Sequence, residues 1–202
     1  CRPTSWATFA GHARQVAAVQ RVLRTFDSGA FWIDGPSGVG KTSLAYVIAA
    51  ELGADKFAVT ELDGERCTVD AVRLLADTIH QHSLFSPWQA WIINEAHAMT
   101  AKAVQAWLTL LERLPPRRLV CFTTTEQAEA DLFGTFTRPL LSRCLHVSLT
   151  TAGLAEAYAP VLKAIATTEG LDGQTVEYYE TAIRAERGNL RSVLSKLEMG
   201  SI

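Results

Sequence analysis

A glycine-rich segment in the first quarter of the chain constrains the fold more than any other feature. Residues 35–42 read Gly-Pro-Ser-Gly-Val-Gly-Lys-Thr and fit the pattern G-x-x-x-x-G-K-[ST]. An apolar run at residues 30–33 precedes the segment, and a helical pattern begins at Thr42. In a strand–loop–helix unit of this kind, backbone N–H groups converge on a phosphate at the positive end of the helix. The segment therefore predicts a site for nucleotide phosphates rather than a plain glycine-rich turn.

The pattern also assigns roles to individual residues. We expect Lys41 to neutralise the β- and γ-phosphates and the Thr42 hydroxyl to bind Mg²⁺. ATP or ADP, together with Mg²⁺, is therefore the expected cofactor. The loop residues expected to contact it are Gly35, Pro36, Ser37, Gly38, Val39, Gly40, Lys41, Thr42 and Ser43. A dinucleotide-binding oxidoreductase is excluded, because the glycine spacing of that class is different.

The order of apolar runs and helical patterns predicts the fold class. Strand-like runs occupy residues 30–33, 57–62, 89–93, 119–122 and 145–149, and helical patterns occupy residues 42–52, 69–80 and 101–114. This alternation predicts an α/β fold, with a five-stranded parallel sheet flanked by helices on both faces. Helical patterns alone follow, at residues 154–168, 175–186 and 189–197. We therefore expect a nucleotide-binding domain at residues 1–149 and a small all-α domain at residues 150–202.

Composition narrows the class of protein. Of the 202 residues, 48% are hydrophobic, which is enough for a packed core, and the net charge of -2 means that any DNA contact must be local. The four cysteines (Cys1, Cys67, Cys121 and Cys144) form no CxxC pair, so reduced thiols are favoured over a zinc site or a disulfide framework. No apolar run approaches the roughly 20 residues of a membrane span, and no signal peptide is visible. Because the chain begins with cysteine, we expect its native start to be missing.

The third apolar run ends in two polar residues, Asn94 and Glu95. ATPases of this topology hold Mg²⁺ and activate water at that strand end. Glu95 is expected to act as the general base toward the attacking water, and the alternative is an ordinary surface carboxylate. Asn94 is expected to bind the metal together with Thr42. An amide carries no negative charge, so the affinity for Mg²⁺ is expected to be weaker and hydrolysis slower.

Three later residues have both a functional and an ordinary interpretation. Thr125 follows the fourth apolar run, where it would position the attacking water, although threonine often caps a turn there. Arg143 precedes the fifth run, and Arg191 opens the last helical pattern. Chemistry alone does not separate a catalytic role for either arginine from a surface salt bridge or a solvated position.

Taken in this order, these features resemble the AAA+ ATPases of the clamp-loader family, which includes the DNA polymerase III gamma/tau subunits and the small subunits of replication factor C. The likeness covers essentially the whole chain. It is carried by residues 2–3 and 9–12, the phosphate loop, residues 94–100 and 106–112, residues 122–126, residues 141–144 and residues 188–191. The sequence Leu-Ser-Arg-Cys at residues 141–144 is the most specific of these.

The resemblance implies roles that chemistry alone left open. Arg143 would be an arginine finger that acts in trans, on ATP held by a neighbouring subunit. Arg191 would reach from the helical domain, the lid of this family, to the γ-phosphate of its own subunit's ATP. Arg2 and Gly11 would lie beside the adenine.

The resemblance also implies partners and a location. The partners would be other clamp-loader subunits in a ring, a sliding clamp and primer–template DNA, with no membrane partner. DNA would meet the starts of two helical patterns, at Thr68 and at Thr100 with Lys102, although ordinary helix caps explain these residues equally well. The location would be the cytoplasm of a bacterium or a phage-infected cell, at the nucleoid.

The chain departs from the family pattern at several places. Asn94 stands where an aspartate is usual, which bears on hydrolysis and not on binding. The cysteine cluster of the bacterial gamma/tau zinc module is absent, and so is the collar domain that follows the lid, which suggests a truncated chain. An acidic stretch from Glu126 to Asp131 exceeds the family pattern and is interpreted as a solvated loop.

Three functions remain open on the sequence. The first is an ATPase that couples hydrolysis to clamp loading. The second is a nucleotide-binding subunit that hydrolyses little ATP itself and supplies Arg143 to a neighbour. The third is a AAA+ ATPase of repair or recombination, against which the sequence at residues 142–144 argues.

Overall fold

The computed structural model of the chain describes residues 3–79, 86–125, 138–171 and 173–202. Arg2, expected beside the adenine, and the acidic stretch from Glu126 to Asp131 lie outside the described residues. All the other residues singled out for the site lie within them.

Five parallel strands form one sheet. They are β1 (Gly29–Asp34), β2 (Val59–Asp63), β3 (Gln89–Asn94), β4 (Arg118–Thr123) and β5 (Cys144–Ser148), in the spatial order β2-β3-β4-β1-β5. Because all strands run the same way, the loops after β1, β3 and β4 leave the sheet at the same edge. In open parallel sheets this carboxyl edge is where ligands bind. The predicted α/β fold with a five-stranded parallel sheet is confirmed.

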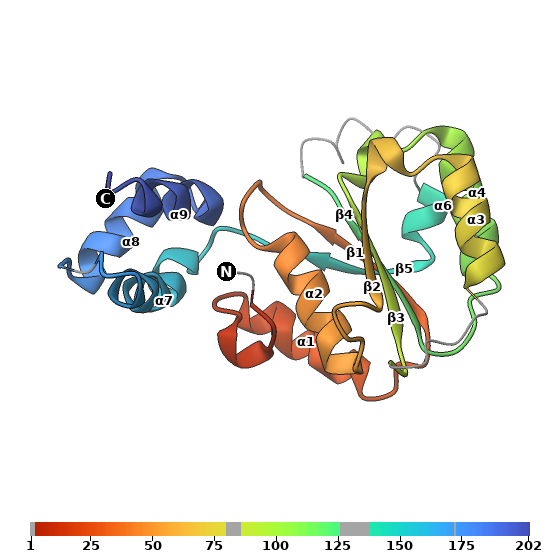
Figure 1. Ribbon diagram of the computed structural model, residues 1–202, viewed down its shortest axis with the longest axis horizontal. Helices are drawn as coiled ribbons and strands as arrows, with labels where there is room; N and C mark the ends of the chain where they lie inside the picture. The colour runs from red at the N-terminus through yellow and green to blue at the C-terminus, as the bar shows by residue number, and fades with distance from the viewer. Residues whose placement is uncertain (1–2, 80–85, 126–137, 172) are drawn as a thin grey trace.

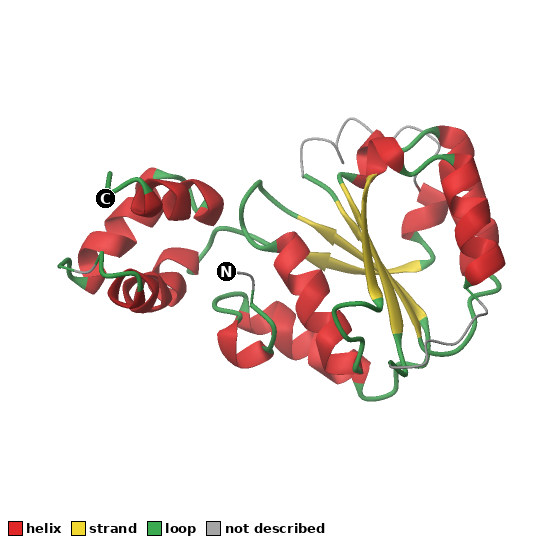
Figure 2. Ribbon diagram, in the orientation of Figure 1, coloured by secondary structure: helices red, strands yellow, loops and turns green. Residues whose placement is uncertain are grey.

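Helices cover both faces of the sheet (Figures 1 and 2). Helices α1 (Ala13–Leu23) and α2 (Lys41–Leu52) lie on one face, and α3 (Val69–Thr78), α4 (Ala101–Leu111) and α6 (Arg138–Leu141) lie on the other. Three short 3-10 helices occupy Trp6–Thr8, Gly64–Arg66 and Ala96–Ala98. The sequence patterns do not predict α1, α6 or the 3-10 helices. Most of these segments are too short to show an apolar period.

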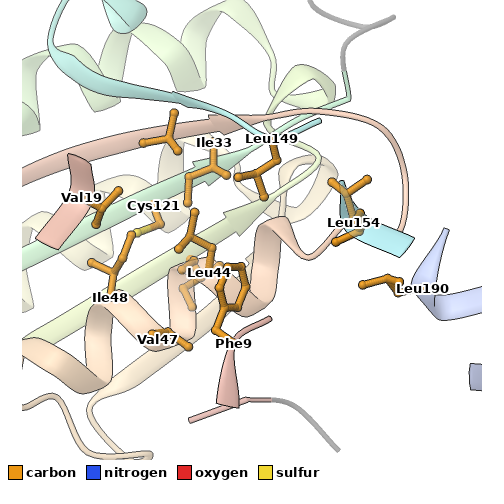
Figure 3. Packing of buried hydrophobic residues seen from close by; sticks show 14 of the residues in the cluster. Phe9, Val19, Ile33, Leu44, Val47, Ile48, Cys121, Leu149, Leu154 and Leu190 are labelled. Atoms are coloured by element: carbon orange, nitrogen blue, oxygen red, sulfur yellow. The ribbon is translucent and has the colours of Figure 1, made fainter. Parts of the chain in front are cut away.

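Side chains of β1 alternate between two hydrophobic clusters, one on each face of the sheet. Phe31 and Ile33 belong to the cluster that contains α2, whereas Ala30 and Trp32 belong to the cluster that contains α3 and α4. This is the period of two expected of a strand buried on both faces. Figure 3 shows part of the first cluster, where Ile33 of β1 packs with Leu44 and Ile48 of α2. The packing holds the phosphate loop between two rigid elements.

The C-terminal part of the described chain is helical throughout. It consists of α7 (Leu154–Thr168), α8 (Val176–Ala185) and α9 (Leu190–Glu198), close to the three predicted segments. Leu154 and Leu190 belong to the same hydrophobic cluster as Ile33 and Leu44, so the helical part shares a core with one face of the sheet (Figure 3). The division into domains at residue 149 stays a prediction, although the change from strands to helices falls between β5 and α7.

Candidate nucleotide-binding site

The glycine-rich loop connects β1 to α2, and two of its glycines are required by close contacts. Gly35 has φ 143°, and a Cβ there would lie 2.4 Å from the Leu149 carbonyl oxygen. Gly38 has φ 77°, and a Cβ there would lie 1.9 Å from Asn189 Oδ1. Any larger residue would therefore both strain the backbone and collide with a neighbour. The loop is therefore in close contact with Leu149, which follows β5, and with Asn189, which caps α9.

Lys41, at the start of α2, is buried, with 7% of its surface exposed to solvent. Its Nζ donates to the carbonyl oxygens of Gly35 at 2.9 Å and Pro36 at 2.8 Å. An ammonium group has three donors, and carbonyl oxygens carry only partial charge. Phosphate oxygens at the loop would offer this cation a stronger, charge-assisted hydrogen bond.

A cavity of about 890 Å³ opens beside the loop. Its size falls in the range of small-molecule sites. Three groups of described residues line it: loop residues 37–43, the strand-end residues Glu61, Asp63, Asn94, Glu95 and Thr123, and lid residues that include Leu190, Arg191, Leu194 and Ser195. Apolar or small residues complete the wall, among them Pro3, Phe9, Ala10, Tyr158, Val161 and Ile165. The cavity therefore has a polar end at the sheet and a more apolar end at the N-terminal segment and α7.

Asn94 joins the phosphate loop to two strands. Thr42 Oγ1–H donates to Asn94 Oδ1 at 2.8 Å, and Thr123 Oγ1–H donates to the same oxygen at 3.1 Å. On the other side, Asn94 Nδ2–H donates to Glu61 Oε1 at 2.6 Å. The sequence predicts Thr42 and Asn94 as site residues but contains no local pattern that marks Glu61 or Thr123. Glu61 lies 33 positions before Asn94, and only the pairing of β2 with β3 brings the two together.

Glu95 stands at the end of β3 in a left-handed backbone conformation, with φ 48° and ψ 49°. This region is uncommon for residues other than glycine and occurs often at functional sites. Its side chain is half exposed and lines the cavity, and its Oε2 lies 3.5 Å from His97 Nδ1. Glu95 therefore shares the cavity with the phosphate loop.

The threonine at the end of β4 that faces the site is Thr123. It is buried, lines the cavity and contacts Asn94, whereas Thr125 is half buried and is absent from the residues that line the cavity in the described chain. The role expected of Thr125 stays a prediction, and Thr123 is the threonine of this strand end that lines the cavity. Two positions along a strand share a face, but β4 ends at Thr123, so the alternation does not extend to Thr125.

Arg143 lies at the opposite edge of the sheet from the phosphate loop. It precedes β5, whose first residue Cys144 pairs with Ala30 at the beginning of β1, while Asp34 at the end of β1 pairs with Ser148. Arg143 Nη2–H donates to Glu112 Oε1 at 2.6 Å, and its Nη1–H donates to the Pro139 carbonyl at 3.0 Å. The Arg143 side chain therefore contacts the C-terminal end of α4 and helix α6 rather than the cavity of its own chain.

Arg191, in contrast, lines the cavity from the first turn of α9. The start of this helix is fastened to the phosphate loop, because Leu190 N–H donates to the Gly38 carbonyl at 3.1 Å. Asn189 Oδ1 accepts from Ser192 N–H at 3.1 Å and so caps the helix. A nucleotide in the cavity would lie within reach of both the loop and this arginine.

The N-terminal segment also meets the phosphate loop. His12 Nε2–H donates to the Val39 carbonyl at 3.0 Å, and burial lowers the pKa of His12, an effect that this hydrogen bond partly offsets. Phe9 lines the cavity. Gly11 packs against Leu154 and, within the described chain, does not line the cavity.

The residues proposed for DNA contact lie together at the starts of α3 and α4, around a second, shallower pocket. Thr68 and Thr100 cap these helices, since their hydroxyls accept from Ala71 N–H and Ala103 N–H, each at 3.2 Å. Lys102 lies in the first turn of α4, beside the start of α3. The capping alternative is therefore realised for both threonines. A contact of Lys102 with DNA stays a prediction.

The donor set at the end of β3 fits a magnesium ion. The hydroxyl oxygen of Thr42 and the amide oxygen of Asn94 meet there, with the Glu61 carboxylate bound to the amide nitrogen, and hard cations prefer oxygen ligands. Among the described residues, no group of three or more His, Cys, Asp or Glu side chains is placed to hold a metal by itself.

The sheet order, the phosphate loop and the helices that follow β5 define a AAA+ fold. The profile of the family described as "DNA polymerase III, delta subunit" matches residues 51–152. The chain belongs to this family, and the clamp-loader assignment made from the sequence is confirmed.

Curated relatives carry names from the same complex. The gamma subunit of DNA polymerase III from Buchnera aphidicola is 24% identical over 220 residues, which cover 98% of this chain and 59% of the relative. The gamma/tau subunit from Mycobacterium tuberculosis is 28% identical over 153 residues, which cover 62% of this chain and 26% of the relative. The chain thus spans less than two thirds of the length of these relatives.

Solved structures show the same fold. A RuvB protein from Thermotoga maritima superimposes with a TM-score of 0.77 at 18% identity, over 98% of this chain and 64% of that one. A DNA polymerase III gamma subunit-related protein from the same organism superimposes with a TM-score of 0.57 at 16% identity, over 83% of this chain and 57% of that one. Within the described residues, no helix has both the length and the apolar character that crossing a membrane requires.

Proposed function

We propose that this chain binds ATP in the cavity beside the phosphate loop and, as a clamp-loader subunit, couples ATP binding and hydrolysis to loading of a sliding clamp on primer–template DNA. One observation carries the proposal. A single cavity is lined by the phosphate loop, by Glu95 at the end of β3 and by Arg191 of the lid. Phosphate binding, water activation and lid closure can therefore act on one ligand.

The cavity's two ends suit the two ends of ATP. The phosphates would lie against the N–H groups of residues 38–42 and the Lys41 ammonium, at the start of α2. The adenine would lie at the more apolar end, near Phe9, Tyr158 and Ile165. Arg191 would then lie on the γ-phosphate side, as expected of a lid that responds to nucleotide state.

Hydrolysis would depend on side chains at the ends of β3 and β4 and on the bound metal ion. Glu95 would take a proton from the attacking water, and Thr123, rather than Thr125, would help to fix the strand ends around it. When bound, Mg²⁺ would neutralise charge on the phosphate oxygens. Thr42 and Asn94 are the residues that would hold it.

We propose that Arg143 completes the site of a neighbouring subunit. Five residues of β5 separate it from the edge of the sheet where the phosphate loop lies, a span of roughly 16 Å at strand rise. Its guanidinium would stabilise the charge that develops on a neighbour's γ-phosphate. Hydrolysis would then depend on assembly of the ring.

A second function is favoured by Asn94, which brings no charge of its own to the metal site. The chain would then hold nucleotide and supply Arg143 to its neighbour, with little turnover at its own site. A role in repair or recombination has no specific support, because the likeness to RuvB is below 25% identity and concerns the fold.

Partners and location follow from the proposed function. The chain would assemble with other clamp-loader subunits, a sliding clamp and primer–template DNA. It would act at the bacterial nucleoid in the cytoplasm, where the relatives named as DNA polymerase III subunits would meet their template.

Nucleotide binding tests the first step. Calorimetric titration of the parent chain with ATP should show one site, and Lys41→Ala should weaken binding by about tenfold or more, since a charge-assisted hydrogen bond is lost. Lys56→Ala, an exposed lysine outside the cavity, is the matched control and should bind as the parent does. Equal ATP affinity in Lys41→Ala and the parent would rule out the proposed site.

Turnover tests the second step and separates the two candidate functions. ATP hydrolysis by the assembled complex should rise on addition of a sliding clamp and primed DNA. A Glu95→Gln subunit should lower that stimulated rate if this chain hydrolyses ATP itself. An unchanged rate would favour the subunit that holds nucleotide without turnover.

A further inference from the structure

Glu61 on β2 is connected to the phosphate loop through a continuous set of hydrogen bonds. Its Oε1 accepts from Asn94 Nδ2–H at 2.6 Å, and its Oε2 accepts from the Tyr46 hydroxyl at 2.6 Å. Asn94 Oδ1 in turn accepts from Thr42 Oγ1–H at 2.8 Å. Thr42 and Tyr46 are four residues apart and so lie on one face of α2. The helix therefore meets both Asn94 and Glu61 along the same line.

The carboxylate of Glu61 decides which way the Asn94 amide points. An ionised carboxylate only accepts hydrogen bonds, so the amide nitrogen has to face Glu61. The amide oxygen is then left for the hydroxyls of Thr42 and Thr123. With its proton engaged in this bond, the Thr42 oxygen presents its lone pairs to the cavity, as a ligand of a divalent cation must.

Charge is the second consequence of this contact. Asn94 is neutral, whereas the carboxylate that touches it is not, and both side chains line the cavity. An aspartate at position 94 would place one negative charge beside Thr42. In this chain the single negative charge is on Glu61, which is separated from Thr42 by the Asn94 amide.

We propose that Glu61 is a positioning residue for the divalent cation that accompanies the nucleotide. Glu61 supplies the negative charge that position 94 lacks, and it orients the Asn94 amide so that the amide oxygen faces Thr42. The inference rests on the proposed function, because it assumes that ATP occupies the cavity. If Glu61 has this role, the neutral Asn94 does not leave the metal site without charge, because the Glu61–Asn94 pair together carries one negative charge.

The net charge of the pair can be varied in four chains. The parent carries one negative charge, Glu61→Gln none, Asn94→Asp two, and the double variant Glu61→Gln/Asn94→Asp one charge at the exchanged position. For each, ATP affinity is measured by calorimetry in EDTA and again in saturating Mg²⁺. The ratio of the two affinities, the magnesium gain, reports the cation rather than the nucleotide. Glu51→Gln, an exposed carboxylate on α2 outside the cavity, is the control.

The magnesium gain should follow the charge of the pair. We expect Glu61→Gln to lower it by about tenfold, Asn94→Asp to raise it, and the double variant to return it to within about threefold of the parent. Electron paramagnetic resonance of Mn²⁺ with ATP should give the same order of cation affinities. Thermal unfolding of each variant identifies any loss of fold, and the double variant keeps a donor–acceptor pair at these positions.

Two results would overturn the inference while leaving ATP binding intact. One is a magnesium gain in Glu61→Gln equal to that of the parent. The other is a double variant that matches Asn94→Asp, since position 94 alone would then govern the cation. A parent chain that binds no ATP in either condition would overturn the proposed function, and this inference with it.

Discussion

At the scale of single residues, His12 ties the N-terminal segment to the phosphate loop in its neutral form. Its Nε2–H donates to the Val39 carbonyl, and burial lowers the pKa of His12. A group whose pKa is lower in the folded state stabilises the fold above its unfolded pKa, near 6.5, and loses that contribution as the pH falls. The parent should therefore lose stability between about pH 7.5 and pH 5.5.

The variant His12→Gln keeps a side-chain donor and cannot titrate in this range. Urea unfolding at the two pH values should show a smaller loss of unfolding free energy for the variant than for the parent. The same pH dependence in both chains would mean that His12 does not carry the effect.

Gly38 gives a second prediction at this scale. Alanine there would have to adopt a left-handed conformation, which costs on the order of 1–2 kcal/mol, and its Cβ would meet Asn189. Gly38→Ala should therefore lower both the unfolding free energy and the ATP affinity, because the start of α9 has to move away from the loop. Gly173→Ala is the control, since a Cβ there meets nothing within 4 Å. Equal losses in the two variants would argue against a specific contact between loop and lid.

At the scale of elements, α3 and α4 begin side by side on the face of the sheet away from α2 (Figure 1). Their positive ends and Lys102 would meet DNA phosphates, whereas Thr68 and Thr100 are already engaged as caps. Replacing either threonine would therefore cost about 1 kcal/mol of helix stability. A change in DNA affinity could then not be separated from a change in the fold. Lys102 is the cleaner position.

In the assembled complex, Lys102→Ala should weaken binding to primed DNA about equally for all sequences. The slope of log affinity against log salt should fall by about one. Lys163→Ala, on α7 of the lid, should leave both quantities unchanged. DNA binding that does not weaken as salt rises would contradict an electrostatic contact at this surface.

At the scale of the whole molecule, the sheet separates the two arginines. Arg191 lines the chain's own cavity, and Arg143 lies at the opposite edge of the sheet, held by Glu112. In mixed assemblies, Arg143→Ala subunits should bind ATP normally but fail to stimulate a parent neighbour, with a loss of about 10³ in that neighbour's rate. Arg191→Ala should impair the mutated subunit itself. Loss of ATP binding in isolated Arg143→Ala would contradict action in trans.

The features that the sequence alone determined are those that depend on interactions between residues close together in the chain. The phosphate loop, the strands and the main helices depend on glycine conformation, apolar runs and helical periodicity, all of which act over a few residues. For this reason the bounds of β3 and α7 differ little from the predicted segments. The assignment to clamp-loader AAA+ ATPases came from motifs of the same short range.

Tertiary structure decided what depends on distant residues. The placement of Thr123 rather than Thr125 in the cavity depends on where β4 ends, and the Glu61–Asn94 contact depends on β2 lying beside β3. The contact of Asn189 with Gly38 depends on where the lid packs. Pairing across 29 to 151 positions leaves no local pattern, because its energy comes from packing and hydrogen bonds that exist only once the chain has folded.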